Sequence, residues 1–231
     1  MKKFTLIVAG GSGTRMNLSL PKQFIELCGK PILMHTIEAF HRFDKDIKII
    51  LALPEIQFDY WQKLSKKHKF SVPHEVVAGG ETRFHTVKNG LAMIPNEGLV
   101  AIHDGVRPLV SSGTIERCFT TAAQHGNAIP CFPVYETVRQ VKNETNNTID
   151  RASLRLVQTP QVFLCSVIKK AFNQKYDHTF TDDASVLEAA GKKIHLVEGN
   201  RENIKVTDLL DLNIVEALLK NSAITKRLNV S

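Results

Sequence analysis

The chain has 231 residues, 43% of them hydrophobic, and its 30 Lys and Arg residues exceed its 23 Asp and Glu residues, giving a formal net charge of +7. This length and apolar content are sufficient for one α/β domain with a sizeable core, and they exclude a disordered chain. We therefore expect residues 1–231 to form a single domain. The positive balance suits an anionic ligand, and we expect no nucleic-acid partner because no basic run is interleaved with aromatic residues.

The four cysteines are scattered and form no CxxC pair; they are Cys28, Cys118, Cys131 and Cys165. This spacing argues against a zinc site and against a disulfide framework, and it predicts reduced core thiols in a cytoplasmic protein. The sequence has no apolar run of roughly 18 residues, as a membrane span requires, so we expect no membrane partner. The apolar stretch near the N-terminus is too short for a signal peptide.

The first element is a short apolar run with β-branched members, Phe4 to Ala9, which predicts a buried strand. It leads into Gly10, Gly11 and Gly13, whose bare backbone can approach and cradle an anion. Arg15 and Lys22 add two cations, so the stretch predicts triphosphate binding. A dinucleotide fingerprint would need a third glycine, and a P-loop would need Lys-Ser/Thr after Gly13; a plain structural turn stays open.

The next elements alternate helix and strand. We expect a helix from Pro31, a strand over 47–53, a helix over 55–68 with Ile56, Tyr60 and Leu64 on its buried side, and a strand over 75–78. A helix over 82–93 follows Gly79-Gly80. Free N–H groups at that junction would offer a second polar or anionic contact, and a simple strand-to-helix turn is the alternative.

Asp104 directly follows a predicted strand over 99–103. An acid at the carboxyl end of a central strand points into the crevice where open α/β sheets bind ligands. It could hold Mg²⁺ through one carboxylate while substrate phosphates and water complete the octahedron. The structural alternative is an Asp that caps the turn and pairs with Arg107.

The pattern changes after a fifth strand over 128–134. Up to there, alternating strands and helices predict a Rossmann-like, mostly parallel sheet with helices on both faces. Residues 135–158 are polar with β-leaning flanks, which predicts a hairpin arm that leaves the body. Such an arm would bury one face against a twofold partner; an excursion without a partner is the alternative.

The C-terminal part returns to the α/β pattern. We expect a strand or sheet edge over 162–164, a helix over 166–174, another capped by Thr181, and a strand over 194–197. The final helix should turn Leu209, Leu212, Val215 and Leu219 inward. Lys205 alone faces away from the core on its extended segment, which is the usual position of a solvated lysine.

Five motifs, in order, resemble one enzyme family over nearly the full length. They are Val8-Ala9-Gly10-Gly11 with Gly13 and Arg15, continued by Pro21-Lys22-Gln23; His103-Asp104 with Arg107-Pro108; Thr159-Pro160-Gln161; Thr181-Asp182 with Ala184-Ser185; and Asn203 to Thr207. The chain resembles the nucleotidyltransferases that activate sugar or polyol phosphates, and among them the 2-C-methyl-D-erythritol 4-phosphate cytidylyltransferases of non-mevalonate isoprenoid biosynthesis. Ribitol-5-phosphate cytidylyltransferases and a non-catalytic nucleotide-binding regulator are the alternatives.

The resemblance implies an Mg²⁺-dependent homodimer that joins CTP and methylerythritol phosphate, giving CDP-methylerythritol and pyrophosphate. By match, the nucleotide would be bound by Ala9, Gly10, Gly11, Gly13, Arg15, Lys22, Gly80 and Thr86. The polyol phosphate would be bound by Asp104, Arg107, Thr137, Arg151, Thr159, Thr181 and Lys205, with Thr137 and Arg151 donated in trans by the arm. Asp104 would hold the metal, and Arg15, Lys22 and Lys205 would be catalytic. Because the nucleophile is already an anion, we predict no general base and no covalent intermediate.

Overall fold

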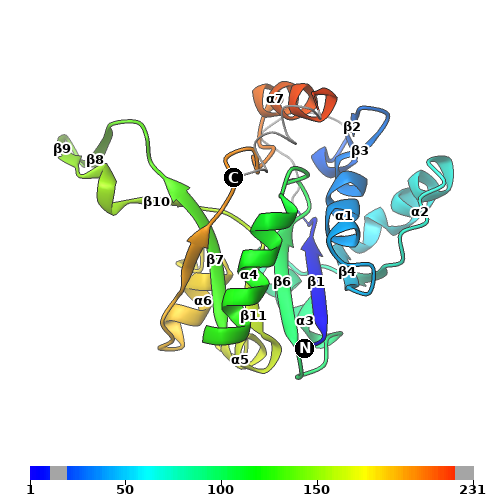
Figure 1. Cartoon of the computed structure of the whole chain (residues 1–231), viewed down its shortest axis with the longest axis horizontal. Coiled ribbons are helices and arrows are strands. Elements are labelled where there is room, and N and C mark those ends of the chain that lie inside the picture. Colours follow the sequence, from blue (N-terminus) through cyan, green and yellow to red (C-terminus); the bar gives the residue numbers. More distant parts are fainter. Residues whose placement is uncertain (11–19, 222–231) are drawn as a thin grey trace.

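The computed structural model describes residues 1–10 and 20–221, and its centre is an eight-stranded sheet (Figure 1). The strand order is β10-β7-β11-β6-β1-β4-β5, and β12 pairs with β7. The strands that run parallel to one another are β1 (Lys3–Val8), β4 (Lys48–Leu53), β5 (Glu75–Ala78), β6 (Leu99–Asp104), β7 (Asn127–Pro133) and β12 (Leu196–Glu198). Only β10 (Arg155–Val157) and β11 (Gln161–Leu164) of this sheet run the other way. The prediction of a mostly parallel sheet is confirmed.

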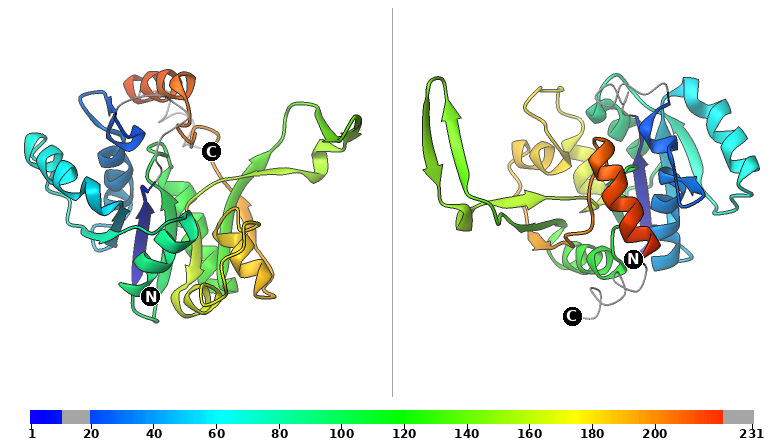
Figure 2. Two further views of the ribbon diagram at one scale, coloured as in Figure 1. Left: turned by 180° about the vertical axis from the view of Figure 1, so that it is seen from behind. Right: turned by 90° about the horizontal axis from the view of Figure 1, so that it is seen from above.

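Helices cover both faces of the sheet, as predicted (Figure 2). One face packs against α1 (Ile32–Phe43), α2 (Phe58–Lys67) and α4 (Ser112–His125). The other face packs against α3 (Arg83–Ala92), α5 (Cys165–Ala171) and α6 (Asp183–Ala189). A third apolar cluster joins α7 (Leu209–Lys220) to the short hairpin of β2 (Glu26–Leu27) and β3 (Lys30–Pro31). Each helix buries an apolar stripe, which the hydrophobic effect favours.

The carboxyl ends of the central strands meet at one edge of the sheet. Val8 at the end of β1 pairs with Asp104 of β6 on one side and with Ala52 of β4 on the other. The chain therefore leaves β1 for the glycine stretch beside Asp104, in the position where open α/β sheets bind their ligands.

The predicted arm is present as a β-hairpin that leaves the body of the molecule (Figures 1 and 2). Its strands are β8 (Val138–Lys142) and β9 (Thr145–Ile149), and Asn143 in the turn has a left-handed φ of 54°. A short 3-10 turn, η4 (Arg151–Ser153), then leads into β10 and back to the sheet. Most residues of β8 and β9 are exposed in the single chain.

The buried face of α2 was predicted wrongly. Ile56 is 91% exposed and Tyr60 39% exposed, whereas Trp61 and Leu64 are buried. The reason is a 3-10 turn, η3 (Glu55–Gln57), which precedes a helix that begins only at Phe58. The tighter winding of that turn changes the angular position of every following side chain.

The strand or sheet edge expected over 162–164 is a strand, β11, which lies between β6 and β7 and not at an edge. Two further expectations need correction. Leu209 is 58% exposed in the first turn of α7, although Leu212 and Val215 are buried as expected. Cys28 is exposed in the turn between β2 and β3, so only the other three thiols belong to the core. Within residues 1–10 and 20–221, no helix has the length and apolar character needed to cross a bilayer.

Candidate active site

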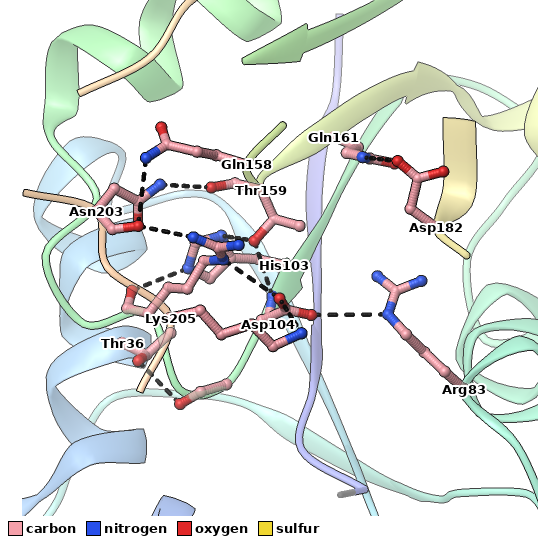
Figure 3. A network of polar contacts seen from close by, with 12 residues as sticks. Thr36, Arg83, His103, Asp104, Gln158, Thr159, Gln161, Asp182, Asn203 and Lys205 are labelled. Carbon is pink, nitrogen blue, oxygen red and sulfur yellow. Dashed lines mark hydrogen bonds and ion pairs between the residues drawn. The ribbon is translucent and has the colours of Figure 1, made fainter. Parts of the chain in front are cut away.

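Asp104 is the centre of a cluster of charges at the carboxyl end of β6 (Figure 3). Its Oδ2 lies 3.0 Å from Lys205 Nζ and 3.3 Å from Arg107 Nε, and its Oδ1 lies 3.6 Å from Arg83 Nε. Burial alone would raise the pKa of this carboxyl, but the cations Arg83, Lys205 and Arg107 hold it well below its usual range. Asp104 is therefore ionised at neutral pH.

Lys205 is exposed, as its place on an extended segment predicts, and it also forms an ion pair with Asp104. The amide of Val206 donates to the carbonyl of Val106 at 3.0 Å, which places the 203–207 segment beside the Asp104–Arg107 turn. The Lys205 side chain is 42% exposed, so one side of it is open to solvent while its ammonium faces Asp104. The structure thus brings Asp104, Arg107 and Lys205 together, as the resemblance implied.

Arg83 belongs to this cluster, although the motif match had not assigned it a role. Its guanidinium makes a bidentate pair with the fully buried Asp183, at 2.8 and 2.7 Å, which joins the first turn of α3 to the first turn of α6. Burial would lower the pKa of Arg83, but Asp183 and Asp104 raise it, so the side chain stays cationic. The sequence does place an Arg in the first helical turn after Gly79-Gly80. Its partner Asp183 lies 100 residues further along the chain, so the sequence alone did not reveal the pair.

Two polar residues behind Asp104 were also absent from the predicted site. Asn203 is fully buried, and its Nδ2 donates to the carbonyl of Thr159 at 2.7 Å. The Asn203 carbonyl accepts a hydrogen bond from Arg107 Nη1 at 2.7 Å. His103 is fully buried and lies between Arg107 and Thr159. Thr159 is near Asp104 as predicted, but its hydroxyl contacts the backbone and His103 (Figure 3).

The predicted nucleotide-binding residues that the structure describes form a second group, next to the charge cluster around Asp104. A Cβ on Gly10 would lie 3.5 Å from Thr86 Oγ1, so the start of the glycine stretch packs on Thr86. The Thr86 hydroxyl accepts from the Gly80 amide at 3.0 Å and donates to the carbonyl of Thr82. Ala9, Gly10, Gly80 and Thr86 therefore lie together.

The expectation of free N–H groups at Gly79-Gly80 was wrong. The Gly79 amide donates to the carbonyl of Leu53 at 2.7 Å, and the Gly80 amide donates to Thr86. Both donors thus have acceptors within the protein, because the junction is folded tightly against the end of β4.

Lys22 lies in a 3-10 turn, η2 (Lys22–Phe24), that is tied to the end of β1. The buried Gln23 next to it donates from Nε2 to the carbonyl of Ala9 at 2.9 Å. The pKa of Asp211 in α7 is lowered. Burial would raise this pKa, but hydrogen bonds from Thr207 and the positive charge of Lys22 lower it. Lys22 is therefore beside the start of the glycine stretch and within electrostatic reach of the helix that follows Lys205.

The remaining predicted residues are not part of this group in the single chain. Gly11, Gly13 and Arg15 lie outside the described residues. Thr137 and Arg151 are exposed on the arm, where Arg151 donates to the carbonyl of Tyr135. Thr181 is exposed, and it is not the cap of α6: Asp182 caps that helix in a reciprocal capping box with Ser185. Sequence reasoning placed the cap one residue early because Thr181 and Asp182 are both good N-caps.

The chemistry of Asp104 fits a magnesium ion. Magnesium takes one or two protein carboxylates and completes its octahedron with water and substrate phosphates. The described residues contain no group of three or more His, Cys, Asp or Glu side chains that could form a complete protein cage. An ionised carboxylate at the ligand-binding edge of the sheet, with cations for phosphates around it, suits a metal that arrives with a phosphorylated substrate.

Comparison with known proteins gives a consistent assignment. The family model of 2-C-methyl-D-erythritol 4-phosphate cytidylyltransferase (IspD) matches residues 4–221. Proteins of that name from Bacteroides thetaiotaomicron and Porphyromonas gingivalis are 53% and 48% identical, covering 95% and 94% of this chain and 100% and 98% of their own. The 4-diphosphocytidyl-2C-methyl-D-erythritol synthase from Anaerococcus prevotii superposes with a TM-score of 0.80 at 26% identity, covering 95% of this chain and 99% of its own.

The cytidylyltransferase from Thermus thermophilus superposes with a TM-score of 0.75 at 29% identity, covering 95% of this chain and 100% of its own. These likenesses extend over both the sheet and the arm, since the matches span almost the whole sequence. The matched region also contains the whole charge cluster around Asp104, together with the described root of the glycine stretch. On these grounds the chain belongs to the 2-C-methyl-D-erythritol 4-phosphate cytidylyltransferase family.

Proposed function

We propose that this chain transfers the cytidylyl group of CTP to 2-C-methyl-D-erythritol 4-phosphate, forming CDP-methylerythritol and pyrophosphate in isoprenoid precursor biosynthesis. The observation that carries the proposal is the cluster in which one ionised carboxylate, Asp104, is surrounded by Arg83, Arg107 and Lys205. This cluster lies beside the start of the glycine stretch, so a triphosphate and a second phosphate can meet at one place.

The reaction needs positioning and positive charge more than acid–base chemistry. A phosphate oxygen of the polyol phosphate attacks the α-phosphorus of CTP, the bond to the bridging oxygen breaks, and pyrophosphate leaves with the electron pair. Negative charge grows on the α-phosphoryl oxygens, where fixed cations stabilise it. We assign this role to Arg15, Lys22 and Lys205. The attacking oxygen is already anionic, so the reaction proceeds without a general base or a covalent enzyme intermediate.

Asp104 is the residue that would hold Mg²⁺. When bound, the ion supplies charge neutralisation at the phosphate oxygens. Arg107 and Lys205 share Oδ2 of Asp104, so both cations lie where a phosphate beside that carboxylate would contact them. Arg83 contacts the other oxygen and is itself held by Asp183.

The nucleotide end of the proposal rests on the packing around Thr86. Gly10, Gly79 and Gly80 all approach this buried side chain, which gives a close-packed backbone surface next to the triphosphate stretch. We assign nucleotide contacts to Ala9, Gly10, Gly11, Gly13, Gly80 and Thr86, with Gly80 and Thr86 facing the cytidine.

The arm makes the proposed enzyme a homodimer. We propose that residues 1–231 form one nucleotidyltransferase domain with residues 135–158 as an insertion. The hairpin of this insertion extends away from the body (Figure 2). We propose that it reaches the partner subunit and donates Thr137 and Arg151 to the polyol phosphate, which Thr181 also contacts. A cytoplasmic location is part of the proposal; it is supported by four cysteines that are all free, three of them buried.

A pyrophosphate-release assay tests the function. The protein is incubated with CTP and Mg²⁺ and either methylerythritol phosphate or ribitol 5-phosphate. We expect release with methylerythritol phosphate and its loss in Asp104→Asn. Preferred release with ribitol 5-phosphate would assign the sister activity instead. Nucleotide binding without release from either acceptor would indicate a non-catalytic regulator.

A further inference from the structure

A chain of three hydrogen bonds runs behind Asp104 and joins the two ends of the Asp104–Arg107 turn. The Asp104 amide donates to Thr159 Oγ1 at 3.1 Å. Thr159 Oγ1 lies 3.1 Å from His103 Nδ1, and His103 Nε2 lies 3.0 Å from the carbonyl oxygen of Arg107. Figure 3 shows these side chains beside one another. His103 is fully buried and Thr159 is 5% exposed.

The direction of each bond follows from the atoms involved. A carbonyl oxygen only accepts, so His103 Nε2 must carry a proton toward Arg107. An amide only donates, so Thr159 Oγ1 accepts from Asp104. A neutral imidazole with its proton on Nε2 has a lone pair on Nδ1, so the Thr159 hydroxyl donates its single proton to that nitrogen. Of the two neutral tautomers of His103, the one with its proton on Nε2 satisfies every group.

This arrangement has a consequence for the substrate contact assigned to Thr159. A hydroxyl binds a phosphate oxygen by donating its proton, and the proton of Thr159 is already donated to His103. The Thr159 carbonyl is also occupied, since it accepts from Asn203 Nδ2 at 2.7 Å. The Thr159 hydroxyl therefore has no proton left for a phosphate in this geometry.

The network instead fixes the residues that do reach the charge cluster. The Asp104 backbone is held through its amide, and the Arg107 backbone through its carbonyl, by the same pair of side chains. The Arg107 guanidinium is held by the carbonyl of Asn203. The ring of His103 also packs edge-on against Phe40, with ring centroids 4.9 Å apart.

We propose that His103 and Thr159 are positioning residues that aim the Asp104 carboxylate and the Arg107 guanidinium at the polyol phosphate and its metal, without touching the substrate. The proposal rests on the proposed function for its kinetic consequence. It replaces the contact between Thr159 and substrate that the family resemblance implied, and it gives His103 a role that the motif match did not.

The kinetic test compares Thr159→Val with Thr159→Ser. Valine keeps the shape but removes the hydroxyl, leaving the Asp104 amide and His103 Nδ1 without partners, whereas serine keeps the bonds. We expect Thr159→Val to lower kcat/KM for methylerythritol phosphate by about 10- to 100-fold, with the KM for CTP changed less than about twofold. Thr159→Ser should restore the wild-type values.

The matched control is Thr5→Val. Thr5 is also fully buried, and within the part of the chain that the structure describes its hydroxyl has no hydrogen-bond partner. The same substitution there removes no bond, so the kinetics should stay at the wild-type level. Equal loss in Thr5→Val and Thr159→Val, or wild-type kinetics in Thr159→Val, would overturn the proposal.

A spectroscopic test does not depend on activity or on a mutant that folds. Long-range proton–nitrogen NMR of the wild-type protein, with labelled histidine, should show His103 protonated on Nε2 and unprotonated on Nδ1 at neutral pH. The opposite tautomer would overturn the proposal. If wild-type protein releases no pyrophosphate with either acceptor, the proposed function fails, and the NMR result still decides the hydrogen-bond chain.

Discussion

At the scale of single residues, the site is organised by one carboxylate and its cations. Asp104 is 7% exposed, and among residues 1–10 and 20–221 three positive side chains contact it within 3.6 Å. Because Arg83 and Arg107 are held by Asp183 and Asn203, Lys205 is the member with the fewest restraints and the most exposure. Its ammonium can move from Asp104 to a phosphate at little cost to the fold.

Lys205→Ala should separate catalysis from stability. We expect kcat/KM to fall at least 100-fold, about 3 kcal/mol at the transition state, because a cation next to the reacting phosphate is lost. The Tm should change little, since Asp104 keeps two arginines and Lys205 is 42% exposed. We predict the same loss of activity for Lys22→Ala. Steady-state kinetics and melting curves check both predictions, with Lys192→Ala, at an exposed lysine, as the control. Near-normal rates in Lys205→Ala and Lys22→Ala would contradict the catalytic roles assigned to these two lysines.

His103 should make the protein lose stability on acidification. Burial lowers the pKa of His103 to about 4, below the roughly 6.5 of an unfolded histidine. Between these values the unfolded chain binds the extra proton, so the free energy of unfolding rises with pH and falls as pH drops from about 6.5 to 4. The loss amounts to about 3 kcal/mol. Denaturant titrations at several pH values from 4.5 to 7.5 give the free energy of unfolding as a function of pH. This free energy should rise less steeply with pH in His103→Gln than in the wild type; an equally steep rise would contradict the prediction.

At the scale of elements, the first turn of α3 connects both halves of the site. Arg83 extends from it toward Asp104 and Asp183, and Thr86 in the same helix packs on the glycine stretch and on Gly80. Thr82 caps this helix by accepting from the His85 amide. A small shift of the turn therefore moves a cation and the nucleotide surface together.

Gly80→Ala should damage this turn. A Cβ at Gly80 would lie 2.5 Å from His85 Cβ and 3.0 Å from the His85 carbonyl carbon, so the backbone of α3 would have to move. We expect a loss of about 1–3 kcal/mol in unfolding free energy and a raised KM for CTP. Gly113→Ala is the control, because the nearest atom to its Cβ is the flexible Arg117 Nη1 at 3.3 Å, and alanine favours the helix. Unchanged KM and stability in Gly80→Ala would contradict the prediction.

The sequence was informative about elements with strong local patterns and less so about how they combine. The alternation of strands and helices, the arm and the Asp104 position could all be predicted, because periodicity, glycines and charges are local signals. The Arg83–Asp183 pair could not, because it joins residues 100 apart through tertiary packing. The sequence left open whether β11 is an inner strand or an edge, because strand order depends on the whole sheet. The buried face of α2 was predicted wrongly because a 3-10 turn precedes the helix.

At the scale of the whole molecule, the arm stands out because most of its residues are exposed in the single chain. It projects from the body (Figure 1). Tyr135, Val141, Leu156 and Val157 along it are exposed. Arg151, which the family resemblance assigns to the substrate, is on this arm and not in the Asp104 cluster of its own chain. A complete site would therefore need two chains.

Mixed dimers test this division. Asp104→Asn and Arg151→Ala chains should each be impaired alone, yet a mixture should regain roughly one quarter of wild-type activity. Random pairing makes about half of the dimers mixed, and one of the two sites in each of those has an intact Asp104 and an intact partner arm. The assay is pyrophosphate release after joint refolding. If Arg151 acted within its own chain, no mixture would recover activity. Arg139→Ala, on the same hairpin, is the control.

Because β11 runs antiparallel to its neighbours, we expect insertions to be tolerated at the tip of the arm but not where the arm returns to the sheet. An antiparallel strand brings its beginning, not its end, to the edge where its parallel neighbours finish, so Thr159 meets Asp104 only two residues after β10 ends at Val157. Insertions at the tip of the hairpin would lengthen the arm and leave this join alone. A residue added between Val157 and Gln161 would displace Thr159 from the Asp104 amide and from His103. Relatives should therefore vary in hairpin length and keep the spacing after it constant.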